Sequence, residues 1–181
     1  MRYYGIFDII IISIKRKCSD KKEKGEVHVT VETKYFGTVE IDEEKVLFFE
    51  SGLIGLEEYK KFAVIHDAQD EKVTISWLQS LEEPNFALPI IDPLFIKPDY
   101  DPVVEDEWLA SLGVAKNEDY FVLVTLTVPE NIEKMTANLK APLVINMNTR
   151  KGAQIIAENQ DYPVRYPIYE VLKSMKEKDG E

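Results

Sequence analysis

The amino-acid sequence predicts an all-β fold, mainly an antiparallel small β-barrel-like domain, with one short helix and a C-terminal amphipathic helix. Three observations lead to this prediction. Short runs of β-branched and aromatic residues recur along the chain, turn-forming residues separate them, and helical periodicity is confined to two segments. About nine strands at such short spacing are typical of a sandwich or small barrel rather than of βαβ units.

The first of these strands shows the clearest alternation. Val29, Val31, Thr33 and Tyr35 alternate with the residues between them, and Gly37 then permits a bend before a second strand at 39–41. The further strand candidates are 46–49, 62–65, 74–79, 86–91, 120–128, 143–145 and 154–157.

Two segments read as helix. The first, 105–112, opens with three acidic residues and is followed by Gly113, which suits a short helix that stops there. In the second, 167–178, apolar residues recur at helical spacing from Ile168 to Met175. Two interpretations of this amphipathic helix stay open: a lid packed on the barrel, or a helix that binds a partner.

Composition limits the function. The chain has 181 residues, with 22 basic and 33 acidic side chains and a formal net charge of -11. This charge opposes direct contact with nucleic acid and favours a basic partner. Cys18 stands alone, His28 and His66 have no zinc-ligand spacing, and phosphate-loop and nucleophile motifs are missing from the sequence. We therefore expect a protein that is not an enzyme, with no catalytic residue, metal or cofactor.

The N-terminal segment, 1–28, differs in character from the rest. It carries 7 basic and 4 acidic residues, whereas the remainder carries 15 and 29. Its apolar run at 5–14 is interrupted by Asp8 and is too short for a membrane helix. Most of the positive charge of the segment follows this run, unlike in a signal peptide. We therefore expect a cytoplasmic protein without membrane contact.

Two interpretations of this segment stay open, an extra strand with a tether and a translated leader. Codons for Lys24, Gly25 and Glu26 can contain a ribosome-binding sequence, and a GUG start codon at Val29 would follow at a workable spacing. We expect that 1–28 lie outside the natural protein and that 29–181 form a single domain, which intact-mass analysis of the native protein tests.

The most distinctive run is KMTANLKAPLVINMNTRKG, residues 134–152. Pro142 suits the start of a strand, 143–145 favour the pleated surface, and the Asn-rich segment from Asn146 satisfies the backbone of a turn. The run predicts a strand, a turn and the start of a return strand. On its residues alone it could be a well-made β-hairpin and no more.

This run, together with ETKYFGTVEI (32–41), SWLQSL (76–81), IDP (91–93) and DYPVRYP (161–167), resembles the flagellar assembly factor FliW family. The segments occur in the family's order and cover nearly everything from 30 to 167. The resemblance departs at 1–28, at SGLIG (51–55), where the family more often has a proline-containing loop, and at 168–181, which is longer than in many members.

The resemblance implies a small β-barrel-like cytoplasmic protein with two partners. These are flagellin and CsrA, a basic dimeric RNA-binding repressor of flagellin translation. FliW-type proteins keep CsrA off RNA, and flagellin competes for them, which couples flagellin synthesis to export. The alternative is a flagellin-specific export chaperone without a translational role, and we expect a monomer when free.

Two regions are predicted to contact partners. Proline-punctuated acidic loops stay at the surface and often carry function. The hairpin has side chains that are too polar for a core. The predicted partner-binding residues are Asp92, Asp99, Tyr100, Asp101, Glu105 and Asp106 in the acidic loops, and Lys140, Ala141, Asn146 and Arg150 around the hairpin. The competing interpretation is that Asn146 and Arg150 only hold the turn together.

Overall fold

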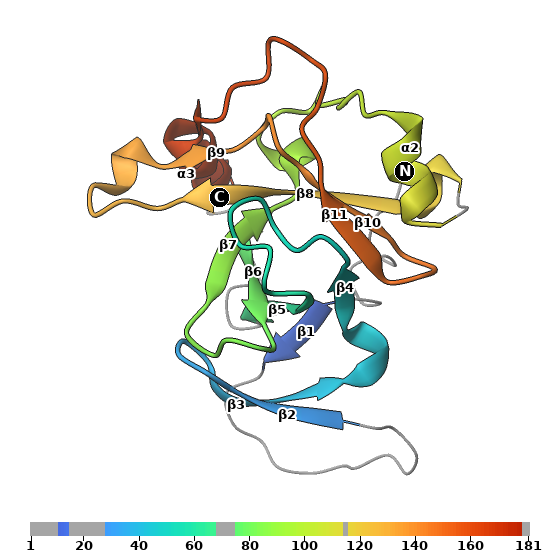
Figure 1. Cartoon of the computed structure of the whole chain (residues 1–181). Helices are drawn as coiled ribbons and strands as arrows, with labels where there is room; N and C mark the ends of the chain where they lie inside the picture. Colours follow the sequence, from blue (N-terminus) through green and yellow to red (C-terminus); the bar gives the residue numbers. More distant parts are fainter. Residues whose placement is uncertain (1–10, 15–27, 68–74, 114–115, 179–181) are drawn as a thin grey trace.

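A computed structural model of the chain describes residues 11–14, 28–67, 75–113 and 116–178. Within these residues, seven strands close into a barrel in the order β10-β11-β4-β5-β6-β7-β8, and β8 pairs back with β10 (Figure 1). Neighbouring barrel strands are antiparallel except β11 and β4, which are parallel. The barrel strands are β4 (Leu47–Phe49), β5 (Lys61–Asp67), β6 (Ile75–Ser80), β7 (Ala87–Ile91), β8 (Tyr120–Thr127), β10 (Leu143–Asn146) and β11 (Lys151–Gln154). The predicted all-β barrel-like fold is confirmed.

The barrel interior is filled by alternate side chains of these strands. On β5, Phe62 and Val64 belong to the interior core, whereas Ala63 and Ile65 belong to a second cluster outside the barrel. Successive strand residues point to opposite faces, so β5 is buried on both sides. The buried members of the interior core are Leu47, Phe49, Leu53, Phe62, Val64, Leu78, Ile90, Phe121, Leu123, Leu143 and Ile145.

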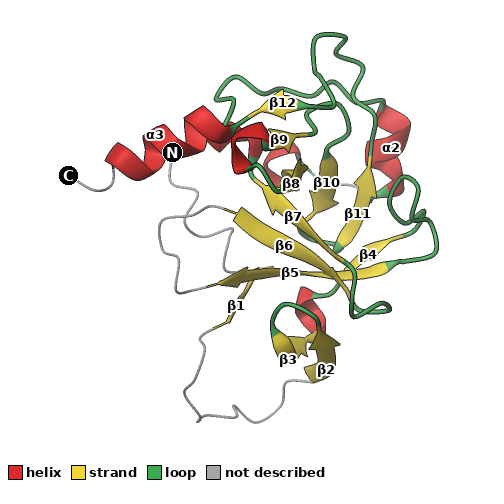
Figure 2. Ribbon diagram, turned by 90° about the vertical axis from the view of Figure 1, so that its left-hand side faces the viewer, coloured by secondary structure: helices red, strands yellow, loops and turns green. Residues whose placement is uncertain are grey.

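A separate two-stranded hairpin covers the outside of β5. Strands β2 (His28–Thr33) and β3 (Gly37–Asp42) pair in antiparallel register, and the turn between them uses Gly37 at φ 66°. The outer side chains of β5 pack with buried Val31 and Ile41 of this hairpin. Figure 2 shows the hairpin lying against the β5 side of the barrel. The predicted bend at Gly37 is confirmed, although β2 ends at Thr33 and not at Tyr35.

The C-terminal helix packs where the sheet extends beyond β8. Short strands β9 (Thr136–Ala137) and β12 (Tyr166–Pro167) extend the sheet beyond β8, and α3 (Tyr169–Lys178) follows. Val171 and Leu172 of α3 pack on a cluster that includes buried Leu126 and Ile168. This packing matches the lid interpretation of the helix. No helix in the described part of the chain is long and apolar enough to cross a membrane.

Strand β1 (Ile11–Ile14) lies in the N-terminal extension and pairs in parallel with β5, with Ile12 opposite Ile65. Ile12 packs on the cluster between β5 and the β2–β3 hairpin. The extension therefore contains the extra strand that was one of its two interpretations. Where the natural protein begins stays a prediction, and the remaining residues of 1–27 lie outside the described part of the chain.

Short helical segments occupy several connections. Helix α2 (Asp106–Ser111) ends before Gly113, which has φ 101°, so the predicted short helix and its glycine stop are confirmed. Beyond α2, Leu112 packs against Val144 and Ile155 on the outside of β10 and β11. The 3-10 turns are η1 (Glu43–Lys45), η2 (Pro93–Phe95), η3 (Asn117–Asp119) and η4 (Ile132–Lys134).

The return strand of the 134–152 hairpin begins earlier than predicted. Strand β11 spans Lys151–Gln154, whereas the sequence indicated 154–157. Antiparallel contact nevertheless continues, because Ile155 N–H donates to Pro142 O at 3.0 Å and Ala157 N–H donates to Lys140 O at 2.9 Å. The register that the turn sets for β11 also places Gly152 opposite Phe49 of β4.

Candidate binding face around the β10–β11 hairpin

The hairpin turn is organised by one buried side chain, Asn146. Its Oδ1 accepts hydrogen bonds from Asn148 N–H at 2.9 Å and Thr149 N–H at 3.3 Å. Its Nδ2 donates to Leu112 O and Gly113 O, both at 3.2 Å. Asparagine is suited to this role because its amide carries both acceptor and donor groups. Asn146 therefore fixes the turn and ties it to the end of α2.

Arg150 closes the same turn from the other side. It has φ 60°, a left-handed conformation that is uncommon for residues other than glycine. Its guanidinium donates from Nε to Glu44 O at 2.8 Å and from a second nitrogen to Met147 O. Its carbonyl accepts from Phe48 N–H of β4 at 2.9 Å. Arg150 thus joins the hairpin to the η1–β4 segment where the barrel closes.

These contacts correct the expected position of three side chains. Asn146 is 0% exposed, and Ala141 and Tyr100 are also buried. The polarity of Asn146 predicts a surface position, but its amide is fully used by the backbone of the turn and of the segment that ends α2. Tyr100 is buried because its hydroxyl donates to Leu139 O at 2.7 Å and its ring stacks on Tyr162. In this structure none of the three presents its side chain to a partner.

The acidic segment, residues 99–107, is held in place by these anchors. Tyr162 OH accepts a hydrogen bond from Asp101 N–H at 2.8 Å. Burial raises the pKa of the Tyr100 phenol, which keeps the proton that it donates. With the backbone fixed in this way, the carboxylates of Asp99 and Asp101 project from the surface.

Two aspartates near this segment have distinct electrostatic environments. Asp99 forms an exposed ion pair with Lys97 at 2.8 Å, and the hydrogen bond from Lys97 lowers the pKa of Asp99. Asp92 is half-buried and caps η2 by accepting from Leu94 N–H at 2.8 Å. Burial raises the pKa of Asp92, and the Leu94 hydrogen bond offsets part of that rise. Asp92 therefore has a structural task, whereas Asp99 is open to solvent.

Asn159 joins the acidic segment to the residues before β10. It donates from Nδ2 to Asp101 O at 3.2 Å and accepts at Oδ1 from Val103 N–H at 2.7 Å. Its carbonyl accepts from Lys140 Nζ at 2.7 Å. Both predicted regions therefore lie in one connected surface, here called the β10–β11 face. The exposed acidic side chains on it are Asp99, Asp101, Glu105, Asp106 and Glu107.

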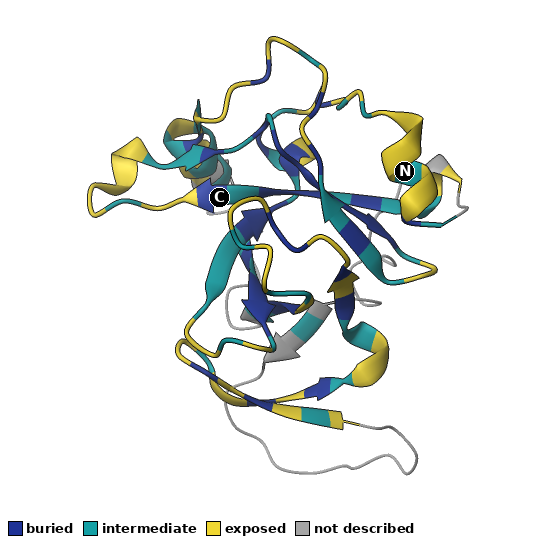
Figure 3. Ribbon diagram, viewed as in Figure 1, coloured by how far each residue is buried: buried dark blue, intermediate teal, exposed yellow. Residues whose placement is uncertain are grey.

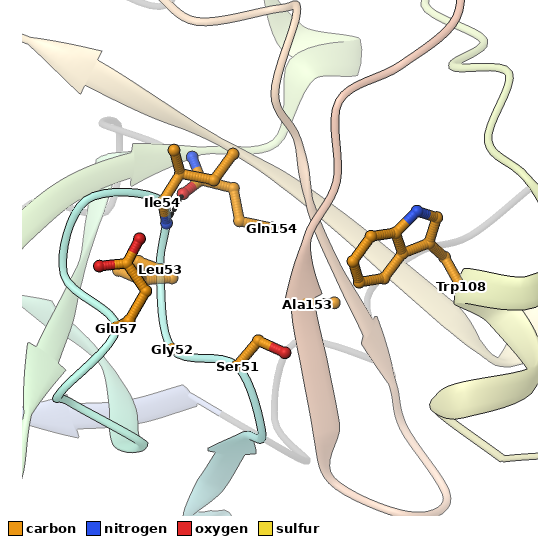
Figure 4. A pocket seen from close by; sticks show the side chains of 8 residues that line it. All are labelled: Ser51, Gly52, Leu53, Ile54, Glu57, Trp108, Ala153 and Gln154. Atoms are coloured by element: carbon orange, nitrogen blue, oxygen red, sulfur yellow. Dashed lines mark hydrogen bonds between the residues drawn. The ribbon is translucent and has the colours of Figure 1, made fainter.

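A small cleft opens on the same face, and the sequence did not identify it. Figure 4 shows Ile54, from the loop between β4 and β5, on one side and Trp108 of α2 on the other, with Ala153 of β11 between them. Ile54 N–H donates to Gln154 Oε1 at 3.0 Å, which holds the loop against β11. The cleft is lined by Ser51, Gly52, Leu53, Ile54, Glu57, Trp108, Ala153 and Gln154, and we call it the Ile54–Trp108 cleft.

The two glycines of the SGLIG loop are the sequence signal that could have indicated this cleft. Gly52 has φ 71°, and a Cβ there would lie 2.7 Å from the Glu57 Cα. Gly55 has φ 82°, and its N–H donates to Glu57 Oε1 at 2.9 Å. The pair of glycines in SGLIG therefore lets the loop fold back on itself, which leaves Ile54 54% exposed. Two apolar residues between turn glycines suggest that one of them is exposed at the tip of the loop. The sequence does not reveal the other wall of the cleft, because Trp108 is distant along the chain.

The cleft is small for a ligand site. Its volume is about 140 Å³, whereas pockets for small molecules usually measure about 300–1,000 Å³. Among the described residues, no group of three or more histidine, cysteine, aspartate or glutamate side chains is placed to hold a metal ion. Figure 3 shows α2 and the neighbouring loops mostly exposed around buried barrel strands. The arrangement suits contact with another macromolecule.

Comparison with known proteins places the fold in a family. The family model described as FliW protein matches residues 30–168. The chain is 49% identical over 145 residues to a flagellar assembly factor FliW of Lachnospira eligens, covering 79% of this chain and 96% of that protein. It is 46% identical over 155 residues to one from Lachnoclostridium phytofermentans, covering 84% and 99%.

A solved structure agrees with these relatives. A crystal structure of the flagellar assembly factor FliW superposes with a TM-score of 0.71 and 32% sequence identity, covering 77% of this chain and 96% of that one. The matched region includes the barrel, the acidic segment and the β10–β11 hairpin. The resemblance stated from the sequence segments is thereby confirmed. The chain belongs to the FliW family of flagellar assembly factors.

Proposed function

We propose that this protein acts in the cytoplasm as a non-enzymatic regulator that binds a CsrA-type RNA-binding repressor and flagellin, one at a time. While it holds the repressor, flagellin mRNA is free for translation. When unsecreted flagellin accumulates, it occupies this protein, and the released repressor returns to the mRNA. Flagellin synthesis is coupled to export in this way.

The observation that carries this proposal is the charge of the acidic segment on the β10–β11 face. Every charged residue between 99 and 112 is acidic, and those side chains are exposed. A surface of this kind repels the phosphate backbone of RNA and attracts a basic RNA-binding protein. Membership of the FliW family supplies the flagellar setting.

The proposed exchange has a thermodynamic requirement. If flagellin lowers the affinity of this protein for the repressor, the repressor must lower its affinity for flagellin by the same factor. Overlapping surfaces satisfy the requirement most simply, because each partner then blocks the other. The connections through Asn159 and Asn146 give the β10–β11 face a rigid support for such a shared surface.

A gel-shift assay tests the regulatory role. Labelled flagellin leader RNA is mixed with the CsrA-type protein encoded in the same genome, and this protein is then added. We expect it to release the RNA without binding RNA itself, and added flagellin to restore the RNA complex. Retention of RNA by this protein alone would contradict the proposal, as would a repressor–RNA complex that it leaves intact.

A further inference from the structure

The Ile54–Trp108 cleft groups large apolar side chains that are exposed to water. Its walls are large apolar side chains with much of their area in water, since Ile54 is 54% and Trp108 is 41% exposed. Ile156, two residues beyond Gln154 in the same extended segment, is 63% exposed. Grouped exposed apolar side chains mark interaction sites more often than single ones do.

Glu57 is the charged side chain among the residues that line the cleft, and the hydrogen bond from Gly55 N–H, together with Lys60 nearby, lowers the pKa of Glu57. The only charged residues between 50 and 58 are Glu50, Glu57 and Glu58, and all three are exposed. On the other side, Trp108 directly follows the acidic segment 99–107. An apolar centre with Glu57 on one side and the acidic segment on the other is complementary to a basic segment that carries one apolar side chain.

We propose that the Ile54–Trp108 cleft is the anchoring site for a basic segment of the repressor, which inserts one apolar side chain between Ile54 and Trp108. This inference rests on the proposed function for the identity of the partner and adds the place and chemistry of contact. The inserted side chain lies over Ala153, and lysine or arginine residues on either side of it meet Glu57 and the acidic segment.

The geometry favours a single inserted side chain. The volume of about 140 Å³ is several times the roughly 30 Å³ that one water molecule occupies in the liquid, but it cannot enclose a helix or a cofactor. The cleft is also held open. Gly52 and Gly55 fix the loop at positive φ, the Ile54–Gln154 hydrogen bond ties it to β11, and α2 is joined to the hairpin through Asn146. A preformed anchor site loses little entropy on binding.

The test uses the full chain with 5-fluorotryptophan at both of its tryptophans. Trp77 stacks on Tyr35 at a ring distance of 5.2 Å in the β2–β3 region, so it serves as an internal reference. Fluorine NMR is recorded as the purified CsrA-type repressor is added, with the Trp108 signal assigned by Trp108→Phe. Affinities are measured in parallel for Trp108→Ala, Ile54→Ser and the control Ile132→Ser. Ile132 has the same 54% exposure as Ile54 but lies in η4, beyond the other end of β8.

We expect the repressor to shift the Trp108 signal and leave that of Trp77 in place. Trp108→Ala and Ile54→Ser should each weaken binding at least about tenfold, and Ile132→Ser should bind as the unaltered protein does. Binding of the repressor with an unmoved Trp108 signal and unchanged variant affinities would overturn the cleft assignment while leaving the proposed function standing. A shift caused by flagellin and not by the repressor would overturn the choice of partner. Absence of any repressor binding to the unaltered protein would overturn both.

Discussion

Arg150 shows how a residue that attracts attention in the sequence can be explained by the backbone around it. The sequence left open whether Arg150 meets a partner or only holds the turn. In the structure its guanidinium is engaged by Glu44 O and Met147 O. Two carbonyl groups from separate segments would lose their donor if the side chain were removed. The geometry therefore favours the turn-holding interpretation.

We predict that Arg150→Ala destabilises the protein by about 1–3 kcal/mol through these lost hydrogen bonds, with unchanged affinity for both partners once folding is corrected for. Arg150→Gly is the matched variant, because it loses the same side chain but adopts φ 60° without strain. It should be more stable than Arg150→Ala by about 1 kcal/mol. Urea denaturation and calorimetry measure these quantities. A fully folded Arg150→Ala protein with weakened binding would instead assign Arg150 to the interface.

Gly152 is required by the packing of β11 on β4. An added Cβ would lie 2.5 Å from Cζ of Phe49, a side chain that is completely buried in the barrel interior. We predict that Gly152→Ala costs about 1–3 kcal/mol, as overpacking of cores does. The double variant Gly152→Ala with Phe49→Leu should be less destabilised than the sum of the two single changes. Additive losses in thermal or urea unfolding would show that the Phe49 contact is not the cause.

At the scale of elements, the acidic segment is the part whose charge should control association. Replacing Asp99, Asp101, Glu105 and Asp106 with their amides keeps the shape of this exposed surface and removes four charges. We predict association with the CsrA-type repressor about tenfold slower at low salt, with a smaller change in dissociation. Association of the unaltered protein should itself slow as the Debye length falls from about 10 to 3 Å. Stopped-flow fluorescence over a salt series measures both effects.

The matched control for this prediction removes four exposed carboxylates elsewhere. Glu130, Glu133, Glu170 and Glu177 lie in and around η4 and α3, away from α2. Their replacement with glutamine changes the net charge by the same amount. Equal slowing by both sets would mean that net charge alone steers the encounter, and the acidic segment would lose its special role.

The elements also differ in how far sequence could predict them. Strands β5, β6, β7, β8 and β10 have apolar or β-branched runs, and the local pattern was sufficient to predict them. Strands β9 and β12 have two residues each, and they exist because β8 and Ala137 offer an edge for pairing. The parallel pairing of β11 with β4 closes the barrel, and no local pattern encodes such a contact.

The candidate site also has parts that the sequence could predict and parts that it could not. The exposed carboxylates of the acidic segment could be predicted, because prolines and charges keep a loop at the surface. Burial of Asn146 and Tyr100 could not, since it depends on carbonyl groups of Leu112 and Leu139 that are distant in sequence. The Ile54–Trp108 cleft was missed for the same reason, as its two walls are brought together only by the fold.

At the scale of the whole molecule, the proposed binding role needs only a barrel with one specialised face. The barrel supplies β10 and β11, the acidic segment and the cleft are fixed to them by hydrogen bonds, and the β2–β3 hairpin and α3 cover other parts of the barrel. A face of this kind has no moving part in the proposed exchange. Competition for one surface is then the simplest source of coupling between the two partners.

The measurement that tests this claim most directly is titration calorimetry with each partner, repeated in the presence of a saturating amount of the other. The account predicts that flagellin lowers the apparent affinity for the CsrA-type repressor, and that the repressor lowers the affinity for flagellin by the same factor. A stable ternary complex in which both affinities are undiminished would contradict it.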